Sequence, residues 1–235
     1  MSARRSPSPL QVLRTVGSAA GGLGLAAGLG AVAVVRRDKP LHAYGRVGTG
    51  TLTVLGEGPA SGVPLLDHPG RHRCTARSSR AMSLAHHGPD VMGVALRIEG
   101  AADDGGPADL LLASTGTGAL TRWLLTLHLH EAGGPLTTLL PQLGSRGAVW
   151  LRLDPAGRSA YDLSWSGTHD HWHRVGRLEL DGSWGEDRPL RFAPVDRPLA
   201  GLRPPTWVRV LRRPAYQAAQ DLTDPATRPT NRSHR

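Results

Sequence analysis

Short apolar runs separated by glycine, proline and aspartate are the feature of this chain that most constrains its fold. The 235 residues include 30 glycines and 19 prolines, which interrupt regular structure and form turns. Apolar runs of four to eight residues between such turns are typical of strands. The predicted strands are 49–55, 91–98, 109–113, 148–153, 177–180 and 190–193. They indicate an antiparallel barrel or sandwich, mainly β with a few helices (α+β); residues 118–130 fit a helix or a strand.

Residues 41–54 place a histidine, His42, ahead of three spaced glycines and an alternating run. Glycine lets another group approach the backbone closely. Leucine and valine alternate with threonine over 51–54, which is the two-residue period of a half-buried strand. The pattern predicts that His42 lies just before the start of a strand, beside space left by the glycines, where a proton-transfer group could act. A surface-loop histidine is the alternative.

Further segments follow in an order that matches a known family. They are Arg77-Ser78-Ser79, the Asp-x-x-Gly-x-Ala pattern at 90–95, Asp-Leu-Leu-Leu-Ala-Ser at 109–114, Val-Gly-x-Leu-x-Leu at 175–180, Leu-Arg-Phe-Ala-Pro at 190–194 and Arg-x-x-x-Tyr at 212–216. Together with His-Ala-x-Gly at 42–45, this ordered set resembles the haem-dependent catalases over residues 38–217. The chain looks like a shortened member of that superfamily. The resemblance implies a catalase-like antiparallel β-barrel at 39–216 with a helical N-terminal arm.

The resemblance also implies catalytic roles for three residues. His42 falls on the distal acid/base, and Ser79 falls on the serine that orients the histidine ring. Ser114 stands where the family has an asparagine. A hydroxyl reaches less far than a carboxamide, and the chain has one phenylalanine for a haem-pocket wall. We therefore expect peroxidase-like activity on peroxide or an organic hydroperoxide, and not fast dismutation.

The remaining implied residues would bind the haem. Arg77 and Lys39 fall on basic residues that pair with the propionates. Tyr216 falls on the tyrosine that ligates the iron, and Arg212 precedes it by four residues, the family's spacing. A phenol must lose its proton to ligate iron, and an adjacent arginine favours the anion. A haem-dependent oxidoreductase is the expected class. The alternative is a non-catalytic, membrane-associated barrel that has kept the fold and lost the haem and serves as a lipid-binding or interaction module.

A second constellation allows a different chemistry. Histidines at 169, 171 and 173 would share one face of a strand, as would His128 and His130. Such sets can bind zinc or another divalent ion. The alternative function is a metal-dependent, phosphodiesterase-like hydrolase that uses the 169–173 cluster, and the structural alternative is a polar loop.

The two ends of the chain differ from its centre. Residues 1–38 are basic at both flanks and contain an uncharged run at 15–35 rich in glycine, alanine, leucine and valine. About 20 apolar residues can cross a bilayer, so this run fits a membrane anchor, a signal segment or a helix packed on the barrel or on a membrane surface. Residues 217–235 are polar, which predicts a disordered tail.

The charge and cysteine content bound the remaining possibilities. The net charge is +9 and comes from arginine, since Lys39 is the one lysine. No basic stripe is interleaved with stacking aromatic residues, so we expect no nucleic-acid partner. Arginine, alanine and glycine in excess are typical of actinobacterial coding. The single cysteine, Cys74, allows no internal disulfide. We expect a cytoplasmic protein, and the alternative is association with a membrane through residues 15–35. The sequence leaves the oligomeric state open.

Overall fold

The computed structural model describes residues 45–81, 88–168, 171–188 and 190–204. The predicted N-terminal segment 1–38 and the predicted tail 217–235 lie outside these ranges, as do the sequence-based assignments made for them. No helix in the described ranges combines the length and the hydropathy that crossing a membrane would need.

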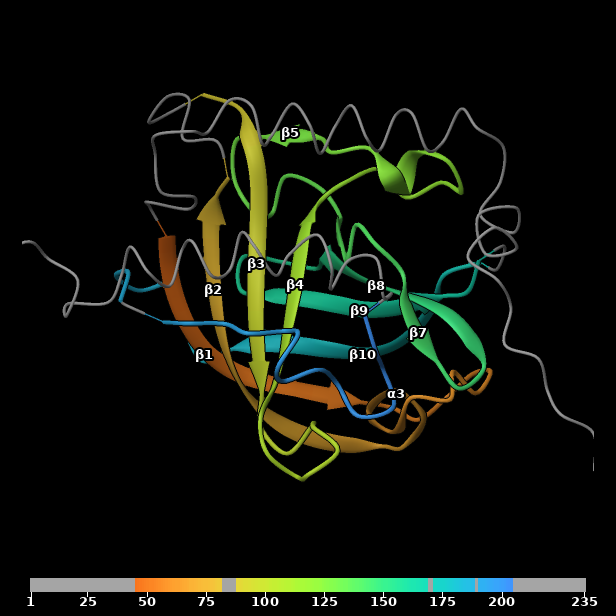
Figure 1. The fold of residues 1–235 in the computed structure, drawn as a ribbon. Coiled ribbons are helices and arrows are strands. Elements are labelled where there is room, and N and C mark those ends of the chain that lie inside the picture. Colours follow the sequence, from red (N-terminus) through yellow and green to blue (C-terminus); the bar gives the residue numbers. More distant parts are fainter. Residues whose placement is uncertain (1–44, 82–87, 169–170, 189, 205–235) are drawn as a thin grey trace, which may run out of the picture.

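The described residues form an antiparallel β-barrel. Its strands are β1 (Gly45–Val54), β2 (Gly70–Arg80), β3 (Asp90–Ile98), β4 (Ala108–Ser114), β5 (Leu127–His128), β6 (Leu136–Thr137), β7 (Gln142–Gly144), β8 (Gly147–Pro155), β9 (Ala160–Ser166) and β10 (His173–Leu180). The hydrogen-bonded order β2-β1-β10-β9-β8-β6-β4-β3 closes because β3 also pairs with β2. Figure 1 shows β2, β3 and β4 crossing in front of β8, β9 and β10. Eight strands thus make a ring, to which β5 and β7 are added at the margins.

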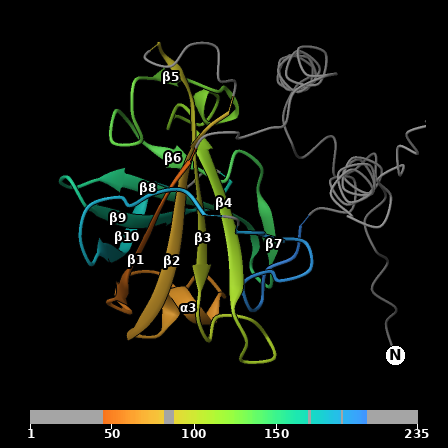
Figure 2. The ribbon, with the colours of Figure 1, turned by 90° about the vertical axis from the view of Figure 1, so that its left-hand side faces the viewer.

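The two-residue period of the strands fills the barrel interior. Alternate residues of β3 and β4, such as Val94, Leu96 and Leu110, belong to one buried cluster with residues of β8, β9 and β10. Residues between them, such as Arg97, face outward. Figure 2 shows the two walls that this cluster joins, β2–β4 and β8–β10. Burial of this apolar surface is the main stabilising term.

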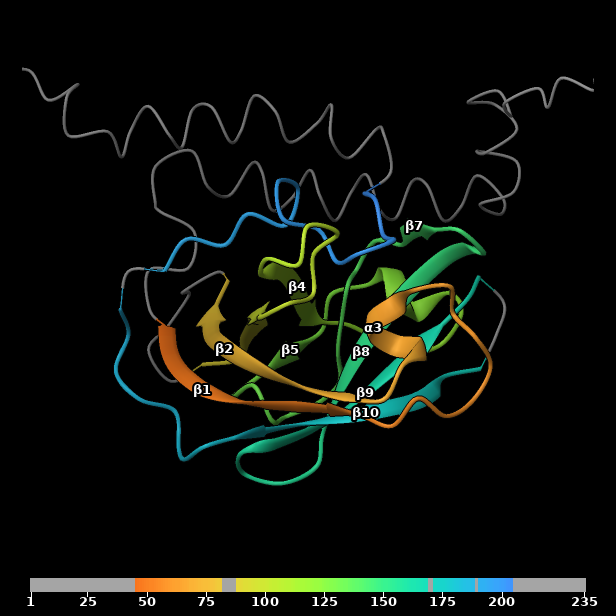
Figure 3. The ribbon, with the colours of Figure 1, turned by 90° about the horizontal axis from the view of Figure 1, so that it is seen from below.

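The ends of the barrel differ. The short helix α3 (Pro64–Asp67) buries Leu65 and Leu66 at one end, which faces the viewer in Figure 3. Figures 1 and 2 both place β5 at the opposite end. There the chain also forms the 3-10 turn η1 (Thr121–Trp123). This second end is where β1 begins and β2 finishes, so it is the end that matters for the predicted site.

The mainly β, barrel prediction is confirmed, with exceptions in detail. Residues 190–193 were predicted as a strand and are not one; the Ala193 N–H donates to the Asp109 carboxylate of β4 instead. The strands β2, β6, β7 and β9 were not predicted. For β2 the reason is its polar outward row, which carries three arginines and Ser79. The ambiguous stretch 118–130 is mostly irregular and contains the 3-10 turn η1 and the two-residue strand β5.

Candidate functional site

A small pocket lies at the β5 end of the barrel. It has a volume of about 140 Å³ and is lined by the start of β1, the end of β2, the start of β3 and the loop 129–131. Its lining residues include Gly45, Ser79, Met92 and Glu131. Gly45 is three residues after His42, so the chain that carries the predicted distal histidine enters the barrel at this pocket.

An ion pair occupies the inner side of the pocket. Glu131 is only 6% exposed, and its carboxylate accepts hydrogen bonds from Arg46 Nη2 at 2.9 and 2.8 Å. Tyr161 of β9 is buried deeper in the barrel. Burial raises the pKa of Tyr161 to about 12, and the charge of Glu131 acts in the same direction. The phenol therefore stays protonated at neutral pH and cannot act as an anion here.

The predicted residues Arg77 and Ser79 share one row of β2. Cys74 and Ala76 belong to the core cluster, so the alternation of side chains puts Ser78 inside the barrel and Arg77 and Ser79 on its outer face. Ser79 is 7% exposed and lies opposite Gly45 of β1. The structure thus brings these two predicted residues together, beside the strand that follows His42.

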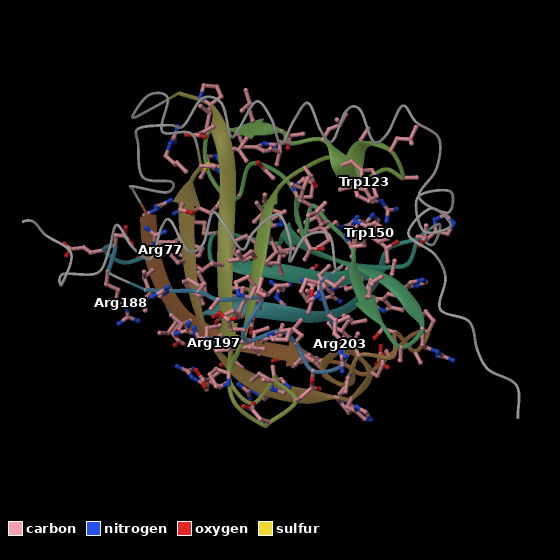
Figure 4. All side chains as sticks on the ribbon, viewed as in Figure 1. Arg77, Trp123, Trp150, Arg188, Arg197 and Arg203 are labelled. Atoms are coloured by element: carbon pink, nitrogen blue, oxygen red, sulfur yellow. The ribbon has the colours of Figure 1, made fainter. Side chains whose placement is uncertain are left out.

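Arg77 forms a bidentate ion pair with the carboxylate of Asp187. Its Nε donates to Asp187 Oδ1 at 2.9 Å and its Nη2 donates to Oδ2 at 2.8 Å. The Arg77 guanidinium hydrogen bond is the largest cause of the lowered pKa of Asp187, and the backbone N–H of Gly45 also contributes to it. In Figure 4, Arg77 and Arg188 lie on one side of the barrel, away from Trp123 and Trp150. On the outer face of β1 and β2, Arg77 is therefore paired with a carboxylate of the same chain, that of Asp187.

Gly45 leaves the space that the Arg77 guanidinium occupies in this arrangement. A Cβ added at Gly45 would lie 2.6 Å from Arg77 Nη2, closer than real Cβ contacts come. The glycine therefore makes room for the guanidinium that grips Asp187. This is the close approach that the glycines after His42 predicted.

Ser114 lies apart from Arg77 and Ser79. It continues the inner row of β4, after Leu110 and Leu112 of the core cluster. Its Oγ accepts a hydrogen bond from the Met92 N–H at 3.0 Å and donates one to the Thr126 carbonyl at 2.6 Å. The hydroxyl therefore ties β3 and the loop after β4 together, and its predicted catalytic role is not tested by this placement.

The other predicted site residues lie outside the described ranges: Lys39, His42, Arg212 and Tyr216. Of the histidine cluster, His169 is also outside them. Within the described residues, no three histidine, cysteine, aspartate or glutamate side chains gather in a way that could hold a metal ion. The His173 ring instead lies beside Trp165, with ring centroids 5.4 Å apart and the ring planes tilted by 40°, and His128 Nε2 lies 3.0 Å from Thr126 Oγ1.

Sequence reasoning missed three polar residues of this end, namely Arg46, Glu131 and Asp187. Glu131 is 85 residues from Arg46, and Asp187 is 110 residues from Arg77. No local spacing or motif marks such pairs, because only the closure of the barrel brings them together. The one available signal was the set of glycines after His42, which indicated that something approaches the start of β1.

The family comparisons bear on the fold alone. No protein-family model matches the chain, and no curated protein matches its sequence. Among solved structures, a fungal catalase shares 13% identity with a TM-score of 0.52, covering 94% of this chain and 64% of its own. Catalase A from Saccharomyces cerevisiae (11% identity, TM-score 0.52, 82% and 63% covered) and a bacterial catalase (11% identity, TM-score 0.52, 90% and 64% covered) are similar. The chain therefore has a catalase-like fold and spans less than two thirds of the length of these catalases.

Proposed function

We propose that this catalase-like barrel binds haem against the outer face of β1 and β2 and acts on peroxide or an organic hydroperoxide. The observation that carries the proposal is the carboxylate grip of Arg77. The ordered sequence resemblance assigns Arg77 to a haem propionate, and in the structure Arg77 holds the carboxylate of Asp187 at two points. The pairing supports the proposal, because a haem propionate would take the place that the Asp187 carboxylate occupies beside Arg77.

The supporting geometry is that of the immediate surroundings of Arg77. Gly45 leaves space for its guanidinium, and Ser79 lies on the same outer row. A bidentate arginine–carboxylate pair is both strong and directional, so it would fix the edge of a flat ligand. Propionate binding would require Asp187 to release Arg77, because both carboxylates need the same two N–H groups.

The proposed chemistry divides between the chain and the haem. Bound haem would supply an iron centre able to cleave the oxygen–oxygen bond of a peroxide. His42 would take the proton from one peroxide oxygen and return it to the other, which makes water the leaving group. The buried Ser79 hydroxyl would orient the ring of His42, and Lys39 would add positive charge for a propionate. Tyr216 would ligate the iron, and Arg212 would favour its phenolate form.

The described residues favour slow, peroxidase-like turnover over fast dismutation. The Ser114 hydroxyl, which stands at the family's asparagine, already has a backbone donor and a backbone acceptor. It has no free hydrogen to offer a second peroxide molecule, and it lies on the inner row of β4, apart from Arg77 and Ser79. The pocket beside Gly45 is about 140 Å³, smaller than the roughly 300–1,000 Å³ of common ligand sites, which favours a small substrate.

A haemin titration of the full chain, followed by its visible absorption spectrum, tests the proposal. We expect saturable binding that Arg77→Gln weakens about 10- to 100-fold, since a hydrogen bond to a charged group contributes about 1.5–3 kcal/mol. Asp187→Asn should tighten binding, because it removes the competing charge. Tyr216→Phe should change the spectrum of the bound form.

The chain offers a matched control on the same strand. Arg73 of β2 also faces outward and pairs with an aspartate, Asp181, with Nη2 2.9 Å from Oδ2. Arg73→Gln and Asp181→Asn should leave haem affinity unchanged. Haem uptake that is absent, or equally reduced by the Arg73 and Arg77 variants, would rule the site out.

A second candidate is a barrel that keeps the fold without haem. Its supporting observation is the same Asp187, which satisfies Arg77 within the chain at 2.8–2.9 Å. In that case Asp187→Asn would lower stability and would not create haem binding. The titration therefore separates the two candidates directly.

A further inference from the structure

Four leucines of the short segment 120–129, at the β5 end of the barrel, are exposed. The leucine face consists of Leu120, Leu124, Leu127 and Leu129, which are 80, 52, 55 and 60% exposed. They lie within ten residues of each other, around η1 and β5. Single exposed leucines are ordinary, but four within ten residues of one segment suggest a surface that another apolar group covers.

The leucine face is close to the point where the chain enters the barrel. Gly45, the first residue of β1, and Leu129 line the same pocket. The pairing path from Gly45 to Leu127 runs through Ser79, Gly93 and Val91. Three inter-strand steps and two residues along β3 amount to about 21 Å. Whatever precedes Gly45 therefore begins next to this face.

The residues before Gly45 contain the uncharged run 15–35, which has 21 residues without an acidic or basic side chain. The connection from Val35 to Gly45 can span about 33–36 Å when extended. That reach exceeds the path from Gly45 to Leu127. The apolar run can therefore lie over the leucine face without strain in the connection.

We propose that the apolar run 15–35 of the same chain docks on the leucine face and covers it. The two surfaces complement each other, since the run is rich in glycine and alanine and small residues let bulky side chains from a partner approach closely. The proposal does not depend on haem binding, because neither the run 15–35 nor the four leucines are assigned to the haem; Lys39 and His42 lie only in the connection.

The run 15–35 is favoured over a second copy of the chain or a membrane as the group that covers the leucine face, because it is part of the same chain. A short connection gives the run an effective concentration of about a millimolar, whereas a second copy would compete at its own lower concentration. Glycine and alanine make the run only weakly hydrophobic for a bilayer. Docking within the chain therefore satisfies both apolar surfaces without a partner.

The experiment uses the full chain with one added cysteine. Burial raises the pKa of the native Cys74 thiol to about 12, so a cysteine at the surface can be labelled selectively. Leu127→Cys carries a polarity-sensitive dye, and Leu55→Cys, a 41% exposed leucine beyond the other end of β1, is the matched control. The substitution Leu25→Glu, made in the middle of the run, is intended to displace it.

Docking predicts that the dye at position 127 emits at shorter wavelength than the dye at 55, and that Leu25→Glu abolishes this difference. Neither signal should depend on protein concentration or on phosphatidylcholine–phosphatidylglycerol vesicles. A blue shift that appears only with vesicles would assign the face to a membrane, and one that grows with concentration would assign it to a second copy; both overturn the proposal. Equal emission at both positions would do the same.

Hydrogen exchange of the unlabelled chain provides a second measurement, because the dye could itself hinder docking. We expect Leu25→Glu to accelerate amide exchange across residues 124–129 at least 10-fold and to leave β9 unchanged. Exchange of 124–129 that is the same with and without Leu25→Glu would refute docking, whatever the dye reports.

Discussion

Replacing Asp109 with asparagine tests what fastens residues 190–204 to the barrel. The Asp109 side chain is fully buried in β4. Arg97 donates to it from Nε at 2.8 Å and from Nη2 at 3.0 Å, and Arg197 Nη2 lies 3.0 Å from Oδ2. The Ala193 N–H donates to the same Oδ2 at 2.7 Å. One carboxylate therefore joins two arginines and the backbone of a segment about 85 residues away.

The expected cost follows from burial. Asparagine keeps the shape of the side chain but removes its charge, which leaves two guanidinium groups facing each other. Removing one partner of a buried ion pair costs about 3–5 kcal/mol. The Arg197 side chain is 35% exposed, so water compensates part of its loss. We therefore expect a loss near the lower limit, about 3 kcal/mol, and a melting temperature lowered by about 6–12 °C.

Urea unfolding of the full chain measures this loss, with tryptophan fluorescence and circular dichroism as two probes. The midpoint should fall while the denaturant slope stays constant, which marks a change in stability alone. Asp181→Asn is the control, because Asp181 and Arg73 are 48 and 62% exposed and such pairs contribute about 0–1 kcal/mol. If Asp109→Asn costs no more than Asp181→Asn, the argument from burial is wrong.

Three further outcomes are expected. Gly50→Ala should lower the free energy of unfolding by about 2 kcal/mol or more, since its Cβ would lie 2.3 Å from a carbonyl oxygen of β10. Gly182→Ala is the control in the same unfolding assay and should be tolerated, because a Cβ there meets nothing within 4 Å. Cys74 should react with a thiol reagent at pH 8 only after unfolding, because burial raises its pKa to about 12; fast modification of the folded chain would contradict this. The pKa of Asp187 is lowered, chiefly by its hydrogen bond with Arg77, so the stability that this pair contributes is present above about pH 4 and is lost as the pH falls further. Between pH 7 and pH 3, the urea midpoint of Asp187→Asn should therefore fall less than that of the unchanged protein. An equal fall in both proteins would refute the pairing.

The strands most easily predicted were those whose alternation is strong. Residues 91–98 and 148–153 came within three residues of β3 and β8 at each end, because leucine and valine recur at every second position. The strand β2 was missed, since its outward row carries Arg71, Arg73, Arg77 and Ser79 and a polar outer face hides a strand from a search for apolar runs. Residues 190–193 looked like a strand, but their backbone is held by a buried aspartate and not by a neighbouring ladder.

The residues of the candidate site were likewise predicted only in part from the sequence. The resemblance selected Arg77 and Ser79 by order along the chain, and the barrel places them on one row beside Gly45. It also selected Ser114, which β4 turns to the inner row. Alternation along a strand has a period of two, so a single residue of register decides which face a side chain takes.

The amino-acid sequence by itself determined the mainly β architecture, the placing of turns and the catalase-like order of segments, because these depend on periodicity and on local backbone preferences. Only the tertiary structure decided that the Asp187 carboxylate pairs with Arg77 and that Glu131 pairs with Arg46 at the pocket. Each of these contacts joins residues on segments that only the folded chain brings together. Barrel closure sets such distances, and no local pattern in the chain encodes them.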